Sequence, residues 1–396
     1  MNNKKENKVV LACLPELGKV LKAELESLDY KVISFGSKFV EIQATLEDTY
    51  FLNLHIQTAS HIYYLIEEFG AINEKQLYTN LKKIAWETII PDQGYFSIDS
   101  FVSNDTISDK RYANLRVKDA IADRLIDKTG KRADSGNEKN QTVIYLFWNG
   151  DTAKIYLDTS GETLAKRGYR KNPFKAPLNE TLAAGILLST QWDKAKPLVN
   201  PMCGSGTLSI EAARMALNIP AGFYRRNFGF MHYKGYDASV WKKMRADAEK
   251  KILTKTDVKI IATDKNRQAI GASRENAKYA GVEDCIEFSV CNYDKTPMPR
   301  KGGIVIFNPE YGERMGELEY LNEIYKGIGD FLKNQCQGYF GYIFTGNPEL
   351  SKRVGLRTKS RQIFYNAKIE CRLLEYEMFR GDWKGKFNTD GMKNED

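Results

Sequence analysis

The second half of the chain alternates short apolar runs with amphipathic segments of helical period. Short apolar runs bounded by turn residues are typical of strands buried on both faces of a sheet, and the segments between them predict covering helices. Runs predicted as parallel strands lie at residues 197–199, 258–264, 286–293, 304–307 and 339–344. Two further runs, 362–366 and 370–378, follow each other closely and predict an antiparallel hairpin. The pattern therefore predicts a doubly wound α/β sheet with an antiparallel terminal hairpin.

The first half of the chain has a different order, in which strands outnumber helices. Residues 8–50 read as a strand, a helix and two strands. Helices and strands then alternate, with an amphipathic basic helix at 114–125 and a closing hairpin at 143–161. We therefore divide the chain into segments 1–50, 51–160, a basic linker 161–177 and a large α/β domain 178–396. That domain is predicted to begin with a helix at 178–188 and to carry an insertion at 220–251.

The predicted strand at 197–199 leads into a glycine turn (residues 202–206) and then into an Ala-rich helix. Gly204 and Gly206 allow the turn to pass close to a ligand, because no Cβ stands in the way. Ser205 and Thr207 carry hydroxyls that can cap the first free N–H groups of the helix. A strand, a glycine turn and a helix N-terminus together form a ligand cradle at the carboxyl edge of a parallel sheet.

Two common nucleotide-binding motifs do not fit this turn. The phosphate loop requires a lysine after its last glycine, whereas Gly206 is followed by Thr207. The dinucleotide fingerprint requires a third glycine where this chain has Ser209. A structural turn without a ligand is the other interpretation of this segment taken alone.

A second polar turn follows the apolar run at 304–307. Asn308 offers a side-chain amide, Pro309 a backbone carbonyl and Tyr311 an aromatic face. These are the hydrogen-bond acceptors and the stacking surface that the exocyclic amine of a base requires. The turn lies about a hundred residues after the glycine turn, as several intervening βα units require. A plain surface loop is the alternative for this segment alone.

Composition changes this picture mainly in the choice of partner. With 396 residues, 42% hydrophobic and 28% charged, the chain is typical of a soluble globular protein of two or three domains. A net charge of +8 favours a polyanionic partner. Six cysteines without a Cys-x-x-Cys pair and three histidines argue against a disulfide scaffold or a metal site. The apolar run at 9–14 is too short for a signal peptide or a membrane span, so we expect a cytoplasmic protein. No feature of the sequence indicates an oligomeric state.

Four segments resemble known families or folds. Asn-Pro-Met-Cys-Gly-Ser-Gly-Thr at 200–207 resembles motif I of class I S-adenosylmethionine methyltransferases that act on RNA. Asn-Pro-Glu-Tyr-Gly-Glu-Arg at 308–314 resembles the Asn-Pro-Pro-Tyr-Gly-Glu-Arg motif of enzymes that methylate exocyclic amines on bases. Residues 51–160, with Arg-Val-Lys-Asp-Ala-Ile at 116–121 and Leu-Asp-Thr-Ser-Gly at 157–161, resemble the RNA-binding THUMP domain. Residues 1–50 look like a small ferredoxin-like lobe.

Nearly the whole chain is similar to the THUMP-containing large-subunit ribosomal RNA guanine-N2 methyltransferases, which are sometimes labelled N6-adenine-specific DNA methylases. In bacterial members this half is often fused to a second methyltransferase. The resemblance implies an S-adenosyl-L-methionine cofactor and methylation of a guanine N2 amine in RNA, with 23S ribosomal RNA as the expected substrate. It implies a catalytic group of Asn308, Pro309, Glu310 and Tyr311. The residues implied to bind the cofactor are Asn200, Pro201, Met202, Cys203, Gly204, Ser205, Gly206, Thr207, Asp264, Lys265, Asn292, Tyr293 and Asn308.

Two of these cofactor assignments carry specific roles. Asp264, at the end of the second strand, can accept hydrogen bonds from both ribose hydroxyls, or it can cap the following helix. Asn292 and Tyr293 follow the third strand, where similar enzymes hold the adenine edge.

Basic residues in two places are candidate RNA contacts. They are Lys110, Arg111, Arg116 and Lys118 around the amphipathic helix, and Arg167, Tyr169 and Arg170 in the linker. Basic residues interleaved with aromatic ones suit single-stranded RNA, because cations hold phosphates and rings stack on bases. A charged helix is otherwise a solvated face, and the linker is otherwise a connector whose aromatic residues pack on the next domain.

Four residues depart from the family pattern. Asn200, Asn266 and Asn292 are amides where acidic residues are usual, and Glu310 replaces the second proline of the Asn-Pro-Pro-Tyr motif. An amide at 200 weakens contact with the methionine ammonium, which prefers a carboxylate. Glu310 could accept hydrogen bonds from the guanine N1–H and N2 edge. Two functions other than guanine-N2 methylation of 23S RNA stay open. Because the second motif fits any exocyclic amine, one is a transfer RNA guanine-N2 or adenine-N6 methyltransferase. The other, suggested by these four departures, is a non-catalytic RNA-binding assembly factor.

Overall fold

A computed structural model of the chain describes residues 5–92, 94–107, 109–172, 177–311 and 318–379. Two compact units are formed. Unit 1 comprises Met1–Tyr169, Glu180–Gly185 and Asn218–Leu253, and unit 2 comprises Arg170–Asn179, Ile186–Leu217 and Thr254–Asp396. Part of the basic linker, residues 173–176, and the end of the second motif, residues 312–314, lie outside the described residues.

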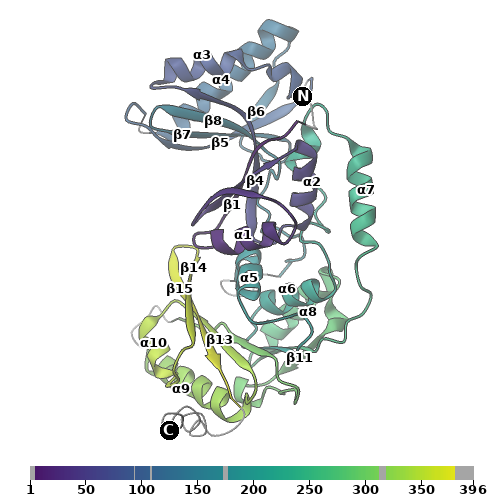
Figure 1. Ribbon diagram of the computed structural model, residues 1–396, viewed down its shortest axis with the longest axis vertical. Helices are drawn as coiled ribbons and strands as arrows, with labels where there is room; N and C mark the ends of the chain where they lie inside the picture. Colours follow the sequence, from purple (N-terminus) through teal and green to yellow (C-terminus); the bar gives the residue numbers. More distant parts are fainter. Residues whose placement is uncertain (1–4, 93, 108, 173–176, 312–317, 380–396) are drawn as a thin grey trace, which may run out of the picture. The chain divides into compact units, whose positions relative to one another are not determined.

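The described part of unit 1 is built on an eight-stranded sheet in the order β2-β3-β1-β4-β8-β7-β5-β6 (Figure 1). Its strands are β1 (Asn7–Cys13), β2 (Val32–Gly36), β3 (Phe39–Ala44), β4 (Ala59–Gly70), β5 (Tyr95–Ser103), β6 (Asp134–Gly136), β7 (Thr142–Asn149) and β8 (Thr152–Asp158). β4 pairs with β1 on one edge and with β8 on the other. The segments predicted at 1–50 and 51–160 therefore share one sheet.

Helices of unit 1 form where the sequence places an apolar stripe. They are α1 (Gly18–Glu26), α2 (Leu46–His55), α3 (Glu74–Lys83), α4 (Lys110–Thr129) and α7 (Ala238–Glu249), with short 3₁₀ turns at Trp86–Thr88 and Gly229–His232. On α4, fully buried side chains recur at Ala113, Val117, Ala120 and Ile121, which is the spacing of one helix face. This face packs beside β5, and α3 lies next to α4 (Figure 1). The predicted hairpins β2–β3 and β7–β8 are confirmed.

Two segments of the region predicted as the α/β domain (178–396) belong to unit 1. In the insertion, the ring of Phe230 stacks on Tyr50 with centroids 4.3 Å apart, and the Gly222 N–H donates to the Leu54 carbonyl at 2.8 Å. The predicted leading helix is α5 (Glu180–Leu188), whose first residues also belong to unit 1. A Cβ on Gly185 would lie 2.3 Å from a methyl carbon of Leu17, so this close approach requires glycine.

Unit 2 is built on a seven-stranded sheet in the order β11-β10-β9-β12-β13-β15-β14. Its strands are β9 (Leu198–Pro201), β10 (Ile260–Asp264), β11 (Ile286–Val290), β12 (Ile304–Phe307), β13 (Phe340–Thr345), β14 (Ser360–Asn366) and β15 (Ile369–Glu377). The first five are parallel, whereas β15 is antiparallel to both β13 and β14. The predicted doubly wound sheet with an antiparallel terminal hairpin is confirmed.

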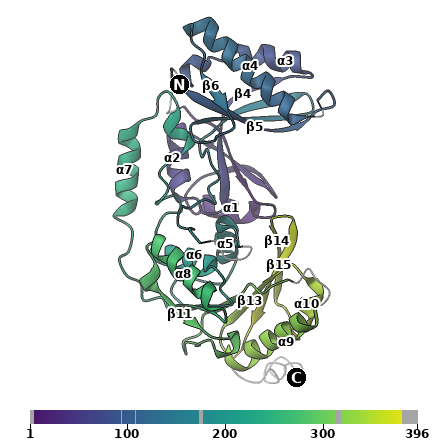
Figure 2. The same cartoon turned by 180° about the vertical axis from the view of Figure 1, so that it is seen from behind.

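Helices of unit 2 are α6 (Thr207–Ala216), α8 (Arg267–Tyr279), α9 (Leu318–Gln335) and α10 (Pro348–Arg353), with 3₁₀ turns at Glu283–Cys285 and Tyr293–Lys295. α9 buries Leu321, Tyr325, Ile328 and Leu332 in the main core of the unit, and α10 lies beside it (Figure 2). Because β9, β10, β11 and β12 are parallel, the turns that follow them meet at one edge of the sheet. Both motifs singled out in the sequence follow strands of this group.

Candidate active site

The glycine turn folds as a tight connection between β9 and α6. Met202, Gly204 and Gly206 all have positive φ, at 59°, 56° and 81°. A Cβ on Gly206 would lie 2.0 Å from the Ser273 hydroxyl oxygen, whereas a Cβ on Gly204 would meet no protein atom within 4 Å. Gly206 is therefore required for packing against α8, while Gly204 leaves open space where a ligand can approach.

The predicted hydroxyl caps of α6 are wrong. Gly206 itself occupies the N-cap position, where no side chain is available to bond the first N–H groups. The Thr207 hydroxyl instead accepts a hydrogen bond from the Arg170 guanidinium at 3.2 Å. The start of α6 therefore has no side-chain acceptor at its N-cap.

Asp264 lies at the end of β10, directly beside the glycine turn. Its Oδ2 accepts from the Gly204 N–H at 3.0 Å and its Oδ1 from the Asn266 N–H at 2.8 Å. The N-cap of α8 is Asn266, not Asp264, because the Asn266 side chain accepts from the Gln268 and Ala269 N–H groups. Each carboxylate oxygen of Asp264 has a second lone pair, so the predicted contact with ribose hydroxyls is sterically and chemically open.

Asn200 is held entirely by protein groups. It is 1% exposed, its Nδ2 donates to the Ile306 carbonyl at 2.9 Å, and its Oδ1 accepts from the Ser209 hydroxyl at 3.0 Å. A carbonyl oxygen can only accept, so the amide nitrogen must face Ile306. The amide at 200 therefore links β9 to β12, a role that a carboxylate could not fill.

The second motif places two side chains in direct contact. The Tyr311 hydroxyl donates to Asn308 Oδ1 at 2.8 Å, and the Asn347 side chain donates to the Tyr311 carbonyl at 3.0 Å. Burial, with the nearby Cys371 thiol, raises the pKa of Tyr311 far above its ordinary value, so the hydroxyl stays protonated. Hydrogen bonds at the side chain and at the backbone carbonyl of Tyr311 thus hold the loop that carries the proposed catalytic residues.

Glu310 is exposed and lies within electrostatic range of Lys265. The hydrogen bond from Lys265 to the Tyr320 hydroxyl, 2.6 Å long, raises the pKa of Lys265, and the charges of Glu310 and Asp264 act in the same direction. Glu310, which stands where the family motif has its second proline, therefore lies near Lys265.

A cavity of about 770 Å³ brings the two motifs together. Of the residues predicted from sequence, it is lined by Asn200, Met202, Cys203, Gly204, Ser205, Thr207, Asp264, Lys265, Asn292, Tyr293, Asn308, Pro309, Glu310 and Tyr311. Two predicted residues are not among those that line it: Pro201 is buried at the end of β9, and Gly206 packs against Ser273. Tyr293 is mainly a core residue, because its ring packs edge-on against Phe307 and Phe331.

Several lining residues were missed by the sequence reasoning. They are Pro177, Leu208, Tyr320, Leu321, Ile324, Gly346, Asn347, Asn366 and Ile369. Asn347 follows β13 and Asn366 is the last residue of β14, more than thirty residues after the motif with which they share the cavity. A polar residue at a strand end is the one signal that could have pointed to them.

The linker residues require a correction. Arg167 and Tyr169 are each 1% exposed, so neither side chain presents itself to RNA as predicted. The Arg167 guanidinium donates to the carbonyls of Leu164 and Gln57 within unit 1. Arg170 donates to the Leu178 carbonyl at 2.6 Å, within unit 2. These residues hold backbone segments in place, which agrees with the connector interpretation.

The basic residues of α4 differ from one another. Lys110 begins the helix, and the Arg111 side chain is 86% exposed and paired with Asp109. Arg116 is largely covered, because its guanidinium lies 4.8 Å from the Tyr78 ring centroid and it pairs with Asp119. Lys118 is half-buried. Among Arg111, Arg116 and Lys118, Arg111 has the most exposed side chain.

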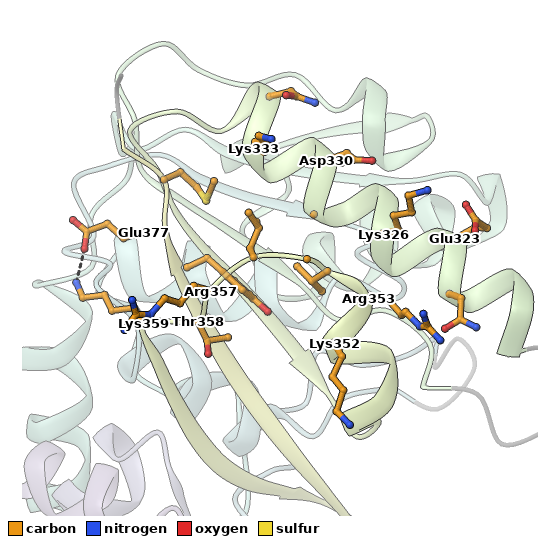
Figure 3. Close-up of a pocket in the computed structure, with 18 of the residues that line it drawn as sticks. Glu323, Lys326, Asp330, Lys333, Lys352, Arg353, Arg357, Thr358, Lys359 and Glu377 are labelled. Atoms are coloured by element: carbon orange, nitrogen blue, oxygen red, sulfur yellow. Dashed lines mark ion pairs between the residues drawn. The ribbon is translucent and has the colours of Figure 1, made fainter. Parts of the chain in front are cut away.

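A wider groove of about 1700 Å³ lies between α9 and the segment from α10 to β14 (Figure 3). Lys352, Arg353, Arg357 and Lys359 line one side, and Glu323, Lys326, Asp330 and Lys333 line the α9 side. Lys359 pairs with Glu377 at 2.9 Å. Although larger, this groove contains no residue of the glycine turn or of 308–311, so we assign the active site to the smaller cavity.

No group of three His, Cys, Asp or Glu side chains suited to a metal ion occurs in the part of the chain that the structure describes. Within the same ranges, no helix is both long and apolar enough to cross a bilayer.

Comparisons with known proteins agree with this architecture. Residues 167–375 match the family model described as RMKL-like, methyltransferase domain, residues 71–158 match the THUMP domain, and residues 8–63 match the RlmL ferredoxin-like domain. Ribosomal RNA large subunit methyltransferase K/L of Syntrophotalea carbinolica is 35% identical over 91% of this chain. The chain spans about half the length of that relative, 52%. Slr0064 of Synechocystis sp., provisionally named an RNA methyltransferase, is 31% identical over 87% of this chain and 89% of its own.

Two solved structures have the same fold over almost the whole chain. SMU.472, provisionally called a methyltransferase and crystallised with SAH, is 25% identical with a TM-score of 0.87, covering 96% of this chain and 100% of that one. A possible methylase from Clostridium difficile 630 is 29% identical with a TM-score of 0.85, over 96% and 100%.

The fold and the cavity define a class I methyltransferase preceded by ferredoxin-like and THUMP domains, and the cofactor of this class is S-adenosylmethionine. Within that class, the chain belongs to the RMKL-like methyltransferase family.

Proposed function

We propose that this protein methylates the exocyclic N2 amine of a guanine in RNA, and that its substrate is 23S ribosomal RNA. The observation that carries this proposal is the position of Asn308 and Tyr311 in the same cavity as the glycine turn. A THUMP domain and relatives named as ribosomal RNA methyltransferases support RNA as the substrate class.

The residues of the cavity fit S-adenosylmethionine. The open space beside Gly204 admits a close ligand, and the Asp264 carboxylate can accept ribose hydroxyls. Asn292 is exposed at the wall where the adenine edge would lie. When bound, S-adenosylmethionine supplies a methyl group on a sulfonium, which is a good leaving group.

The chain's own contribution is to bind and orient the base. A base must leave its stack to bring its edge into such a cavity. Asn308 Oδ1 and the Pro309 carbonyl then accept hydrogen bonds from the exocyclic amine, and the Tyr311 ring forms a stacking wall. Glu310, exposed at the rim, can accept from the guanine N1–H. Positioning of this kind supplies most of the rate enhancement when the methyl donor is already activated.

The test uses tritiated S-adenosylmethionine with protein-free 23S, 16S and bulk transfer RNA from a strain that lacks this gene. We expect label in 23S RNA, recovered as N2-methylguanosine by chromatography. The N308A variant should lose nearly all turnover and still bind S-adenosylmethionine, because Asn308 acts on the base. Full turnover by N308A would contradict the catalytic assignment.

Label in transfer RNA, or recovery of N6-methyladenosine, would retain the methyltransferase class and replace the proposed substrate. Absence of label together with absence of cofactor binding would favour a non-catalytic RNA-binding factor.

A further inference from the structure

The Tyr311 hydroxyl donates a hydrogen bond to Asn308 Oδ1, with 2.8 Å between the two oxygens. The same cavity is lined by Asn366, the last residue of β14, which pairs with Ile369 across a tight hairpin turn. The terminal hairpin of the sheet thus lines the same cavity as the loop that carries the proposed catalytic amide.

The direction of this hydrogen bond follows from chemistry. Burial keeps Tyr311 protonated, so its hydroxyl proton is available to donate. The carbonyl oxygen of Asn308 carries no proton and can only accept.

This arrangement determines which way the Asn308 amide faces. The terminal torsion of an asparagine has two broad minima that exchange the oxygen and the nitrogen. A donor hydroxyl at 2.8 Å selects the orientation with oxygen toward Tyr311 and leaves the second lone pair of that oxygen free. The reversed amide would present N–H groups to the target amine, which is itself a donor.

The tyrosine is held as firmly as the amide it orients. Its carbonyl accepts from the Asn347 side chain at 3.0 Å, and its ring packs edge-on against Phe344 with centroids 6.3 Å apart. A Cβ on Gly346 would lie 3.0 Å from the Tyr311 ring, so the chain passes close to it at this point.

We propose that Tyr311, through its hydroxyl, is a positioning residue that turns the carbonyl oxygen of Asn308 toward the exocyclic amine of the target base. The inference rests on the proposed function and adds to it. A stacking role needs only the ring of Tyr311, whereas the positioning role needs its hydroxyl.

Phenylalanine at 311 separates the two roles, because it keeps the ring and removes the hydroxyl. We expect Y311F to lower kcat roughly 10- to 100-fold, since a misoriented group costs this much even when binding is intact. The KM for RNA and the Kd for S-adenosylmethionine should stay within about twofold of wild type, because the contacts made equally in ground and transition states are retained.

A control variant tests whether the loss of any buried tyrosine hydroxyl in unit 2 would lower kcat. The matched control is Y342F, which removes a buried hydroxyl that accepts from the Gln191 N–H at 2.9 Å elsewhere in unit 2. This control should leave kcat unchanged.

The results that overturn the proposal differ from those that overturn the function. Wild-type kcat in Y311F, with N308A inactive, would refute the positioning role and leave the proposed reaction in place. Full turnover in N308A would refute the catalytic assignment itself. Thermal unfolding of each variant shows whether a loss of kcat reflects a loss of fold.

Discussion

The carboxylate of Asp264 accepts a hydrogen bond from the backbone N–H of Gly204, with 3.0 Å between Oδ2 and nitrogen. Its other oxygen accepts from the Asn266 N–H at 2.8 Å, just before α8. One side chain therefore joins the glycine turn to the start of the next helix. It does so from the position where the ribose of the cofactor is expected.

Removal of this carboxylate should weaken cofactor binding. Hydrogen bonds to a charged acceptor contribute about 1.5–3 kcal/mol each, so we expect D264A to raise the Kd for S-adenosylmethionine at least ~10-fold. D264N keeps one acceptor and should fall between D264A and wild type. Isothermal titration calorimetry measures both, and wild-type affinity in D264A would contradict the assignment.

The two glycines of the turn should respond differently to alanine. In G206A the new Cβ meets the Ser273 hydroxyl oxygen at 2.0 Å in a left-handed backbone, so the melting temperature should fall. In G204A the Cβ meets no protein atom within 4 Å, so the loss of stability should be smaller, while cofactor binding should be lost. Scanning fluorimetry and a binding assay separate these effects. Equal stability of the two variants would contradict this explanation.

Restoring the acid that the family pattern has at position 200 should destabilise this protein. In N200D a carboxylate oxygen would face the Ile306 carbonyl in a site that is 1% exposed. A buried acceptor left without a donor costs about 1–3 kcal/mol, and more if it is charged. The matched control is N266D, where aspartate replaces asparagine as an equally good N-cap. Chemical denaturation should show a lower free energy of unfolding for N200D and an unchanged one for N266D. A wild-type unfolding midpoint in N200D would contradict this prediction.

Exposure on α4 leads to a prediction about RNA binding. The Arg111 side chain is 86% exposed, whereas the Arg116 guanidinium lies over the Tyr78 ring. R111A should therefore weaken RNA binding and reduce the slope of log affinity against log salt by about one. R116A should mainly lower stability. Filter binding at several salt concentrations measures the first effect, and an unchanged salt slope in R111A would remove this residue from the interface.

The stability of unit 1 should depend on pH through His55. Burial, with the positive charge of Lys251 nearby, lowers the pKa of His55 from 6.5 to about 4. The unfolded chain therefore binds a proton that the folded chain does not as the pH falls below 6.5. The stabilising effect of the neutral form is complete above that pH and is lost progressively toward pH 4. H55Q should show a flatter decline of melting temperature between these pH values, and an identical decline would contradict the role of His55.

The sequence by itself determined the local geometry of both motifs. A strand, a glycine turn and a helix at 197–216 follow from short-range rules, because apolar period and backbone freedom at Gly204 and Gly206 act over a few residues. The succession of strands and helices along unit 2 and the closely spaced pair of strands at its end follow from the same patterns. The resemblance of the motifs indicated the cofactor and the family before any contact was known.

Tertiary structure alone decided which polar groups meet. Asn366 lines the same cavity as Tyr311 because β14 and β15 fold back beside β13, and no local pattern encodes that proximity. The burial of Arg167 and Tyr169 likewise depends on neighbours elsewhere in the chain. For this reason the basic and aromatic pattern of the linker wrongly predicted that these two side chains contact RNA. Hydrogen bonds and burial are properties of the packed chain, whereas helices, strands and turns are largely properties of its segments.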